Sequence, residues 1–344
     1  EAELLDMMGH AYRMLADYPS ATEVLLRARS AARTAHSHAR ELSVLKNLGA
    51  VYAASGSHAP ALDTYREALT LARTLEDERT EAVLLGNMGV SHLQRSELHE
   101  AIECMDASLV IRRRLNDYEG IGVELNRLGV AHQTIGNPAK ALECFQQALD
   151  TARAAGNQYR ESIALSNIGL LYRQSGDYAH ALECYLHALR YARGADDRRG
   201  EAEILNNIGF LYLESGEPAA ALQQLQQALT LWEGIGDQRT LAATLNNIGG
   251  ACYQLRDYAA ALAHLQRSRD ISASLNNQPV LAATFRDIGD VLYAQGELVD
   301  AADSYEHALT HARAARHAGH EADALLGLSD VRREQGYLDH ARQH

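Results

Sequence analysis

The chain has 344 residues, of which 47% are hydrophobic and only 6% aromatic, and it contains five prolines. This composition favours helix throughout. Its formal net charge of −13 repels phosphate backbones, so we expect no nucleic-acid partner. The sequence has no apolar run of about 18 residues or more and no recognisable signal peptide, so we expect no membrane partner. Because it begins at Glu1 rather than at Met, we interpret it as excised from a longer protein.

Four cysteines are present, and no pair has the CxxC spacing of a zinc site or a redox motif. Cys104, Cys144 and Cys184 are spaced forty residues apart, and Cys252 lies at a different position of the same period. We therefore expect four reduced cysteines in a cytoplasmic protein, without a metal or another cofactor.

A period of forty residues runs through the whole chain without an insertion or a deletion. Glycine recurs at this period, a large apolar residue precedes it by four positions, and an alanine follows it by twelve. The glycines are Gly9, Gly49, Gly89, Gly129, Gly169, Gly209, Gly249 and Gly289, and Ser329 takes the ninth place. Such self-similarity is typical of a repeat architecture.

In chain order, we predict eight full repeats, which begin near residues 2, 42, 82, 122, 162, 202, 242 and 282, and a truncated ninth repeat from 322. Each repeat contains two helices. The first carries the Leu-x-x-Ile-Gly stripe, and the second carries the alanine and, in most repeats, a large apolar residue four positions later. Between the two helices, glycine at 56, 136, 176, 216, 296 and 336 indicates a turn that ends the first helix.

The repeated glycine and alanine have a physical role in packing. Without large side chains at these two positions, the two helices can cross at the short end of the usual range of about 8–10 Å between helix axes. Large apolar side chains then fill the space on either side of the crossing.

Gly209, Tyr212, Ala221, Leu225 and Ala228 match, in type and spacing, the signature of the tetratricopeptide repeat. The forty-residue period resembles the long-repeat branch found in kinesin light chains, in spindle-orientation adaptors and in bacterial tetratricopeptide signalling proteins. The resemblance covers 1–344. It implies an all-α fold: a single right-handed α-solenoid, or superhelix, of antiparallel helix pairs, with the first helices along its inner face.

A row of asparagines lies on the side of the first helices that faces away from the predicted core. Asparagine holds five of the seven places in this row, and a second row precedes it by one residue. The first row is Asn47, Asn87, Arg127, Asn167, Asn207, Asn247 and Asp287, and the second is Lys46, Gly86, Asn126, Ser166, Asn206, Asn246 and Arg286. Asparagine is a poor helix-interior residue, so its recurrence requires a reason.

Three interpretations of these rows remain open. They form a solvated face, or the amides fix the stacking of neighbouring repeats, or they hold an extended peptide. An amide both donates and accepts a hydrogen bond, so it can pair with the N–H and the C=O of a peptide backbone. The resemblance supports the third interpretation, because the matching residues of related repeats contact bound peptides.

An apolar strip beside the asparagines favours ligand binding, because exposed apolar strips usually mark interaction sites. Arginines near the strip offer a contact for a ligand carboxylate. The predicted peptide-binding residues are Asn47, Asn87, Asn126, Arg127, Asn167, Arg173, Asn206, Asn207, Asn246, Asn247, Arg286, Val90, Val130, Leu170 and Phe210. Val83, Val123 and Ile163 extend the strip.

No catalytic motif is present: the sequence contains no GxSxG, no HExxH, no phosphate-binding loop and no GxGxxG. We therefore predict that the protein is not an enzyme. His307 and His311 are one helical turn apart, but no carboxylate or cysteine completes a metal-binding set.

The predicted function is a scaffold that binds a protein or peptide ligand in its concave groove. The alternative is a sensor, regulatory or oligomerisation module of a larger bacterial signalling protein, which acts on a C-terminal output domain. Because the truncated ninth repeat leaves an uncapped helix face, we also expect self-association through the terminal repeats.

Overall fold

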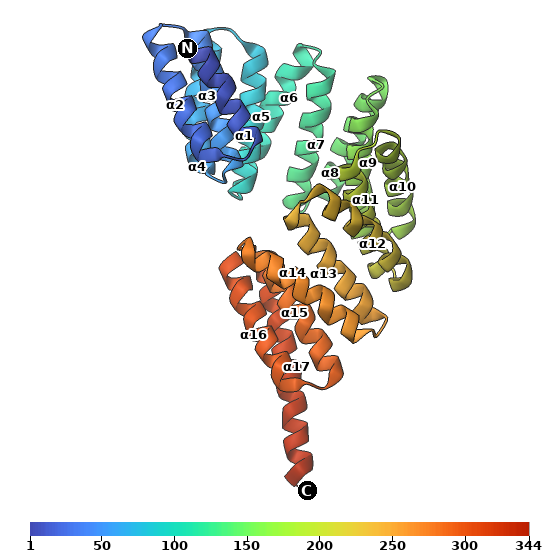
Figure 1. The fold of residues 1–344 in the computed structure, drawn as a ribbon. Helices are drawn as coiled ribbons and strands as arrows, with labels where there is room; N and C mark the ends of the chain where they lie inside the picture. Colours follow the sequence, from blue (N-terminus) through green and yellow to red (C-terminus); the bar gives the residue numbers. More distant parts are fainter. Residues whose placement is uncertain (344) are drawn as a thin grey trace. The chain divides into compact units, whose positions relative to one another are not determined.

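The computed structural model describes the backbone of residues 1–343 and the side chains of residues 1–336. These residues form α-helices only, as the composition predicts (Figure 1). The chain divides into two compact units, residues 1–171 and 172–344. No helix among the described residues is both long and apolar enough to cross a membrane.

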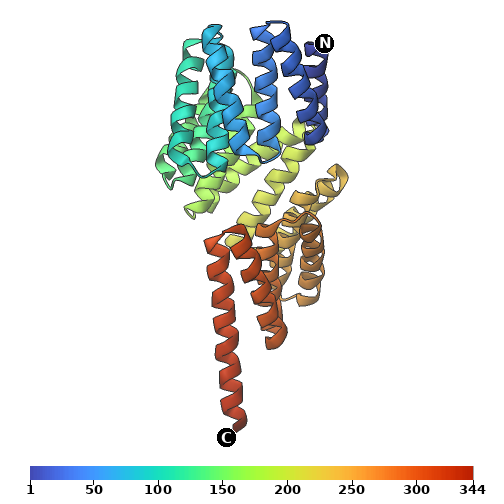
Figure 2. The same ribbon diagram turned by 90° about the vertical axis from the view of Figure 1, so that its left-hand side faces the viewer.

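The helices alternate between the two types that the repeat predicts. The first helices of the pairs are α1 (Ala2–Met14), α3 (His38–Ala54), α5 (Glu78–Gln94), α7 (Tyr118–Thr134), α9 (Gln158–Gln174), α11 (Arg198–Glu214), α13 (Gln238–Gln254), α15 (Gln278–Gln295) and α17 (Ala318–Gln343). The second helices are α2 (Tyr18–Thr34), α4 (His58–Thr74), α6 (Leu98–Arg114), α8 (Pro138–Ala154), α10 (Tyr178–Gly194), α12 (Pro218–Ile235), α14 (Tyr258–Ser274) and α16 (Leu298–Ala315). Figure 2 shows that consecutive helices run in opposite directions.

From the second pair onward, the first helices begin four residues before the predicted repeat starts. An N-cap residue explains several of these starts. The side chain of Asp77 accepts a hydrogen bond from the backbone N–H of Thr80, and Asp117 accepts one from Gly120 in the same way. Such a bond satisfies a backbone donor that the helix itself leaves free.

The turn between the two helices of each pair contains one residue with a positive φ angle. Five of the six predicted turn glycines, Gly56, Gly136, Gly176, Gly216 and Gly296, adopt this conformation. The prediction for Gly336 is wrong, because α17 continues through this position. Among the described residues no second helix follows α17. The chain therefore continues its helical hydrogen bonds at Gly336 and does not form a turn there.

The predicted core stripe is buried in most repeats. The large apolar residue before each glycine is buried from Leu5 to Leu245, whereas Phe285 is half-buried. Exposed members of the stripe occur only in the first and the ninth repeat among the described side chains, where Met8 and Leu325 are exposed. In these two repeats the stripe is packed against a neighbouring repeat on one side only. The repeated alanine is completely buried wherever its side chain is described, and Ala341 lies outside the described side chains.

Seven of the eight repeated glycines pack against a large side chain of the second helix, namely Gly9, Gly49, Gly89, Gly129, Gly209, Gly249 and Gly289. A Cβ atom added to Gly49 would lie 2.4 Å from the ring of Tyr65, and one added to Gly129 would lie 2.3 Å from Phe145. These distances are too short for any real side chain. The glycine is therefore required for the close approach that the sequence predicts.

Consecutive first helices contact one another directly within each unit: α1 contacts α3, α3 contacts α5, and α5 contacts α7, and the same holds from α11 to α17. Second helices of neighbouring pairs meet through long polar side chains, for example where Arg113 Nη2 donates to Gln147 Oε1 at 3.2 Å. The first helices thus form the closely packed inner face of each unit, which is the face that carries the asparagines.

Two adjacent glycines in α13 test this account. Gly249 packs against Leu265, whereas a Cβ at Gly250 would meet open space. We expect Gly249→Ala to lower the free energy of unfolding by about 1–3 kcal/mol, because it overpacks the helix crossing. Gly250→Ala is the matched control and should raise it by about 0.5–1 kcal/mol through helix propensity. Urea unfolding measures both, and a stabilising Gly249→Ala would refute the close-packing role.

Candidate functional site

The asparagines lie between consecutive first helices rather than on a freely solvated face, and they are half-buried. Asn47 Nδ2 donates to Asp6 Oδ1 at 2.7 Å, Asn167 Nδ2 donates to Asn126 Oδ1 at 3.2 Å, and Asn247 Nδ2 donates to Asn206 Oδ1 at 3.1 Å. In every case the donor and the acceptor are 41 residues apart. In these repeats, the first row therefore bonds to the second row of the repeat before it.

These bonds support the stacking interpretation for several of the predicted residues. Asn246 belongs to the same network, because its Nδ2 donates to Asp287 Oδ2 at 2.6 Å. A single bond of this kind contributes about 1 kcal/mol to stability. Each amide keeps a second N–H, so a contact with a ligand stays a prediction for these residues.

Two asparagines of the first row, Asn87 and Asn207, have no hydrogen-bond partner for their side chains among the described residues. Asn87 lines a pocket of about 290 Å³ in the unit formed by residues 1–171. The pocket is lined by Val83, Asn87, Arg112, Asp117, Glu119, Gly120, Val123 and Arg127, which belong to α5, α6 and α7 and to the turn between α6 and α7. It thus unites two predicted ligand contacts, Asn87 and Arg127, with two valines of the predicted apolar strip.

A buried group of charged residues underlies this pocket. Glu124 is 0% exposed and Arg112 is 8% exposed. Glu124 Oε2 lies 3.5 Å from both Arg112 Nε and Arg127 Nη1, and Arg112 Nη1 lies 2.7 Å from Asp117 Oδ2. Ser108 Oγ lies 3.0 Å from Glu124 Oε2 and 2.8 Å from the backbone carbonyl oxygen of Ala82, so its one hydroxyl proton can be donated to either oxygen. Burial raises the pKa of Glu124, although the two arginines and Ser108 favour its charged form.

Two glycines make room for these charges. A Cβ atom on Gly86 would lie 2.6 Å from Glu124 Oε2 and 2.7 Å from Arg127 Nη1, and one on Gly120 would lie 1.9 Å from Arg112 Nη1. The sequence analysis did not identify Glu124 or Arg112 as site residues. The signal was nevertheless present in the sequence, because the equivalent positions of the other repeats are all uncharged: Leu4, Val44, Leu84, Ala164, Ile204, Thr244, Thr284 and Ala324. All of these except Leu4 are buried.

The other predicted arginines are engaged with side chains of their own unit. Arg173 Nη1 lies 2.7 Å from Glu214 Oε1, and its guanidinium lies 4.7 Å from the centre of the Phe210 ring. Arg286 pairs with Asp287, whose pKa burial raises to about 6. The apolar strip is partly accessible, because Val90, Leu170 and Phe210 are half-buried and Val130 is exposed.

The histidine pair stacks on an aromatic ring. The rings of His307 and His311 both stack on the Phe285 ring, with ring centres 5.0 and 5.4 Å away, and His311 Nδ1 is 2.7 Å from Gln278 Oε1. Among the residues with described side chains, no group of histidine, cysteine and acidic residues is arranged to hold a metal ion.

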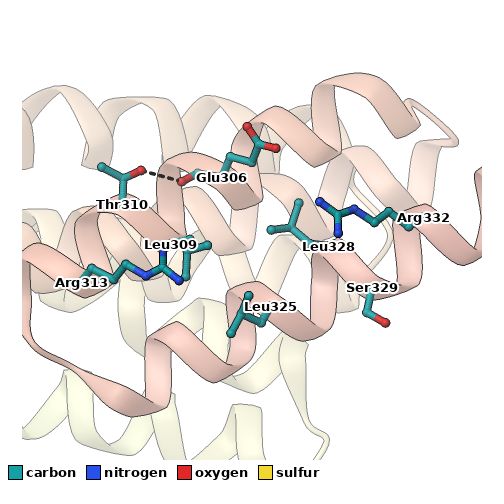
Figure 3. A pocket seen from close by; sticks show the side chains of 8 residues that line it. All are labelled: Glu306, Leu309, Thr310, Arg313, Leu325, Leu328, Ser329 and Arg332. Atoms are coloured by element: carbon teal, nitrogen blue, oxygen red, sulfur yellow. Dashed lines mark hydrogen bonds between the residues drawn. The ribbon is translucent and has the colours of Figure 1, made fainter.

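A groove of about 440 Å³ lies between α16 and α17 at the end of the other unit. Leu309, Leu325 and Leu328 form its apolar part, while Glu306, Arg313 and Arg332 lie around them (Figure 3). Leu325 is 46% exposed, and the adjacent Leu326 is 65% exposed. Within the described residues, α17 therefore exposes apolar side chains beside this groove.

The different bonding of the asparagines leads to a prediction about stability. We expect Asn247→Ala to lower the free energy of unfolding by about 1 kcal/mol, because it removes the bond to Asn206. Asn87→Ala is the matched control: it gains the same helix propensity but breaks no bond, so its effect should stay within about 0.5 kcal/mol of zero. Equal effects of both substitutions in urea unfolding would exclude the stacking role.

Comparisons with known proteins agree on the fold. The tetratricopeptide repeat family model matches residues 1–74, 80–154, 160–234 and 240–314. The apo form of the quorum sensor NprR from B. thuringiensis is 16% identical, with a TM-score of 0.72, and the match covers 90% of this chain and 87% of that chain. A Rap protein complexed with Competence and Sporulation Factor is 13% identical, with a TM-score of 0.62 and coverages of 98% and 99%.

BtubC from P. vanneervenii is 19% identical, with a TM-score of 0.55, and the match covers 64% of this chain and 90% of that chain. No curated protein matches the chain. At these identities the solved structures show similarity of fold alone. The family model, in contrast, covers most of the sequence, and the chain belongs to the tetratricopeptide repeat family.

Proposed function

We propose that this chain is a non-catalytic module that binds a protein or peptide ligand on the inner face of its first helices. The observation that carries the proposal is the pocket lined by Asn87 and Arg127. Membership of the tetratricopeptide repeat family supports it. Further support comes from the solved structures of similar fold, which include a quorum sensor and a Rap protein in complex with a factor.

The pocket offers suitable contacts for an extended peptide. The unpartnered amide of Asn87 can accept from a backbone N–H and donate to a backbone C=O at the same time. Arg127 is 30% exposed and makes only the 3.5 Å contact with Glu124, so it retains N–H groups for a ligand. Val83 and Val123 provide apolar walls for a ligand side chain.

The remaining predicted residues have a secondary role in the proposal. Asn207, in the other unit, is also unpartnered, and we infer that it offers the same kind of contact there. The bonded asparagines contribute mainly by keeping neighbouring first helices in register, and each has an N–H left for a ligand. The half-buried Val90 and Leu170 and the exposed Val130 lie on first helices of one unit, and the half-buried Phe210 lies on a first helix of the other.

A regulatory or oligomerisation module is the second candidate, and the apolar surface of the terminal repeats favours it. Leu4 and Met8 are exposed on α1 and Leu15 is exposed directly after it, and Leu325 and Leu326 are exposed beside the groove of α16 and α17. Exposed apolar surface of this kind usually marks an interaction site. We propose that both ends of the chain take part in self-association.

Selection of random peptides by phage display tests the binding function. We expect the wild type to enrich a set of peptides, and Asn87→Ala and Arg127→Ala each to weaken their binding by at least about tenfold, which is about 1.4 kcal/mol. Arg113→Ala on the outer side of α6 is the matched control and should bind like the wild type. If the wild type enriches nothing, or if the control loses binding equally, the proposed site is excluded.

Sedimentation velocity tests self-association. We expect the wild type to form a dimer or a larger species at micromolar concentration, because apolar surface gains free energy when it is removed from water. Met8→Lys and Leu326→Lys should each shift this equilibrium toward the monomer. Val110→Lys, which replaces an exposed valine on α6, is the control. A wild-type monomer at all accessible concentrations would contradict this second proposal.

A further inference from the structure

The Asn87 pocket is electrostatically balanced before any ligand enters. The guanidinium groups of Arg112 and Arg127 face two carboxylates, of Asp117 and Glu124, at distances between 2.7 and 3.5 Å. Glu119 adds a further carboxylate at the rim, where it is 71% exposed and lies 3.5 Å from Arg160. The arginines can therefore donate hydrogen bonds into the pocket, but their positive charge is already neutralised.

Glu124 is placed where a purely structural residue would not be expected. Its side chain is completely buried, and its Oε1 atom has no hydrogen-bond partner among the described residues. Removing an ionised carboxylate from water is costly unless it is fully paired. A charged residue thus occupies a position that other repeats fill without charge.

The equivalent contact between two later repeats shows that the packing of neighbouring repeats does not require this charge. Ser268 occupies the position equivalent to Ser108, and each hydroxyl oxygen lies 2.8 Å from a backbone carbonyl oxygen, of Ala242 and Ala82 respectively. The residue equivalent to Glu124 is Thr284, whose Oγ1 lies 3.2 Å from Ser268 Oγ. The same packing is therefore achieved with neutral side chains.

We propose that Glu124 is a specificity-determining counter-ion, which makes the pocket select an uncharged amide group of the ligand, from Asn, Gln or the peptide backbone, over a carboxylate. The inference rests on the proposed peptide-binding function. An amide can accept from Arg127 or Asn87 through its oxygen and donate to Asp117 or Glu119 through its nitrogen. A ligand carboxylate would instead add negative charge beside Glu124, Asp117 and Glu119, without an unneutralised cation to compensate for it.

This inference refines the expectation that Arg127 binds a ligand carboxylate. Like charges placed together across an interface are strongly unfavourable. The buried carboxylate therefore acts on the ligand through Arg127: it holds the guanidinium at the pocket and removes the net attraction for anions. Glu124 is in this sense a positioning residue, since Val83, Asn87 and Arg127 line the pocket and Glu124 does not.

The experiment uses two matched pools of synthetic peptides with acetylated and amidated ends. The pools share random apolar positions, but one carries Asn and Gln where the other carries Asp and Glu. We expect the wild type to retain the amide pool at least about tenfold more strongly in affinity selection, a difference of about 1.4 kcal/mol. Glu124→Gln, which keeps an acceptor for Ser108, should reverse this preference. Thr284→Val at the neutral contact is the control and should leave it unchanged.

Lowering the pH provides an independent arm that requires no variant. Because burial raises the pKa of Glu124, this residue takes up a proton before the exposed Asp and Glu side chains of the peptides, whose pKa values are about 4. The wild type should then lose its preference for the amide pool as the pH is lowered from neutrality, before the peptide carboxylates take up protons. Thermal unfolding at each pH establishes that the protein remains folded.

The outcomes separate this inference from the proposed function. If neither pool binds the wild type, peptide binding itself fails and the inference fails with it. If peptides bind but the wild type prefers the acidic pool, the role of Glu124 alone is overturned. The same conclusion follows if neither Glu124→Gln nor the lower pH changes the preference.

Discussion

The arrangement of the helices depends on one recurring contact, between a glycine of the first helix and a large side chain of the second helix of a pair. At Gly49 and Gly129 the partner ring lies so close that no other residue fits. This contact sets how closely the two helices of a pair approach, and the alanine of the second helix is completely buried beside it. Within each unit, consecutive first helices such as α1 and α3 or α13 and α15 contact one another, and polar residues of neighbouring first helices face one another.

The asparagine rows lie at these contacts between first helices. Bonds such as that between Asn247 and Asn206 join residues 41 positions apart, so where they form, a first helix is bonded to its predecessor one residue out of phase. A hydrogen bond of this kind contributes little by itself, but it specifies how neighbouring pairs align. Where the pattern is interrupted, at Gly86 and Arg127, the structure contains the pocket and the buried Glu124. The bonded asparagines keep neighbouring helix pairs aligned. The pocket beside Gly86 and Arg127 is the site at which we place ligand selection.

Some contacts between repeats thus serve packing alone, whereas another lies at the proposed ligand-binding pocket. The contact that contains Ser268 and Thr284 is neutral and completely buried. The equivalent contact at Ser108 contains a carboxylate and two guanidinium groups in contact with a pocket. Buried charges that do not serve stability are commonly retained for a functional reason. This contrast within a single chain supports the proposed role of Glu124.

The sequence by itself determined the period, the two helices of each repeat, the glycine contact and the positions of most turns. All of these depend on local conformation and on the spacing of apolar residues. The helical periodicity also separated the asparagines from the core, but it did not reveal their partners, because a helical wheel contains no information about the neighbouring helix. Only the tertiary structure decided that Asn247 bonds to Asn206, whereas Asn87 has no partner. It also decided that Glu124 lies beneath Arg112 and Arg127, since residues of two repeats must first be packed together before their charges can interact.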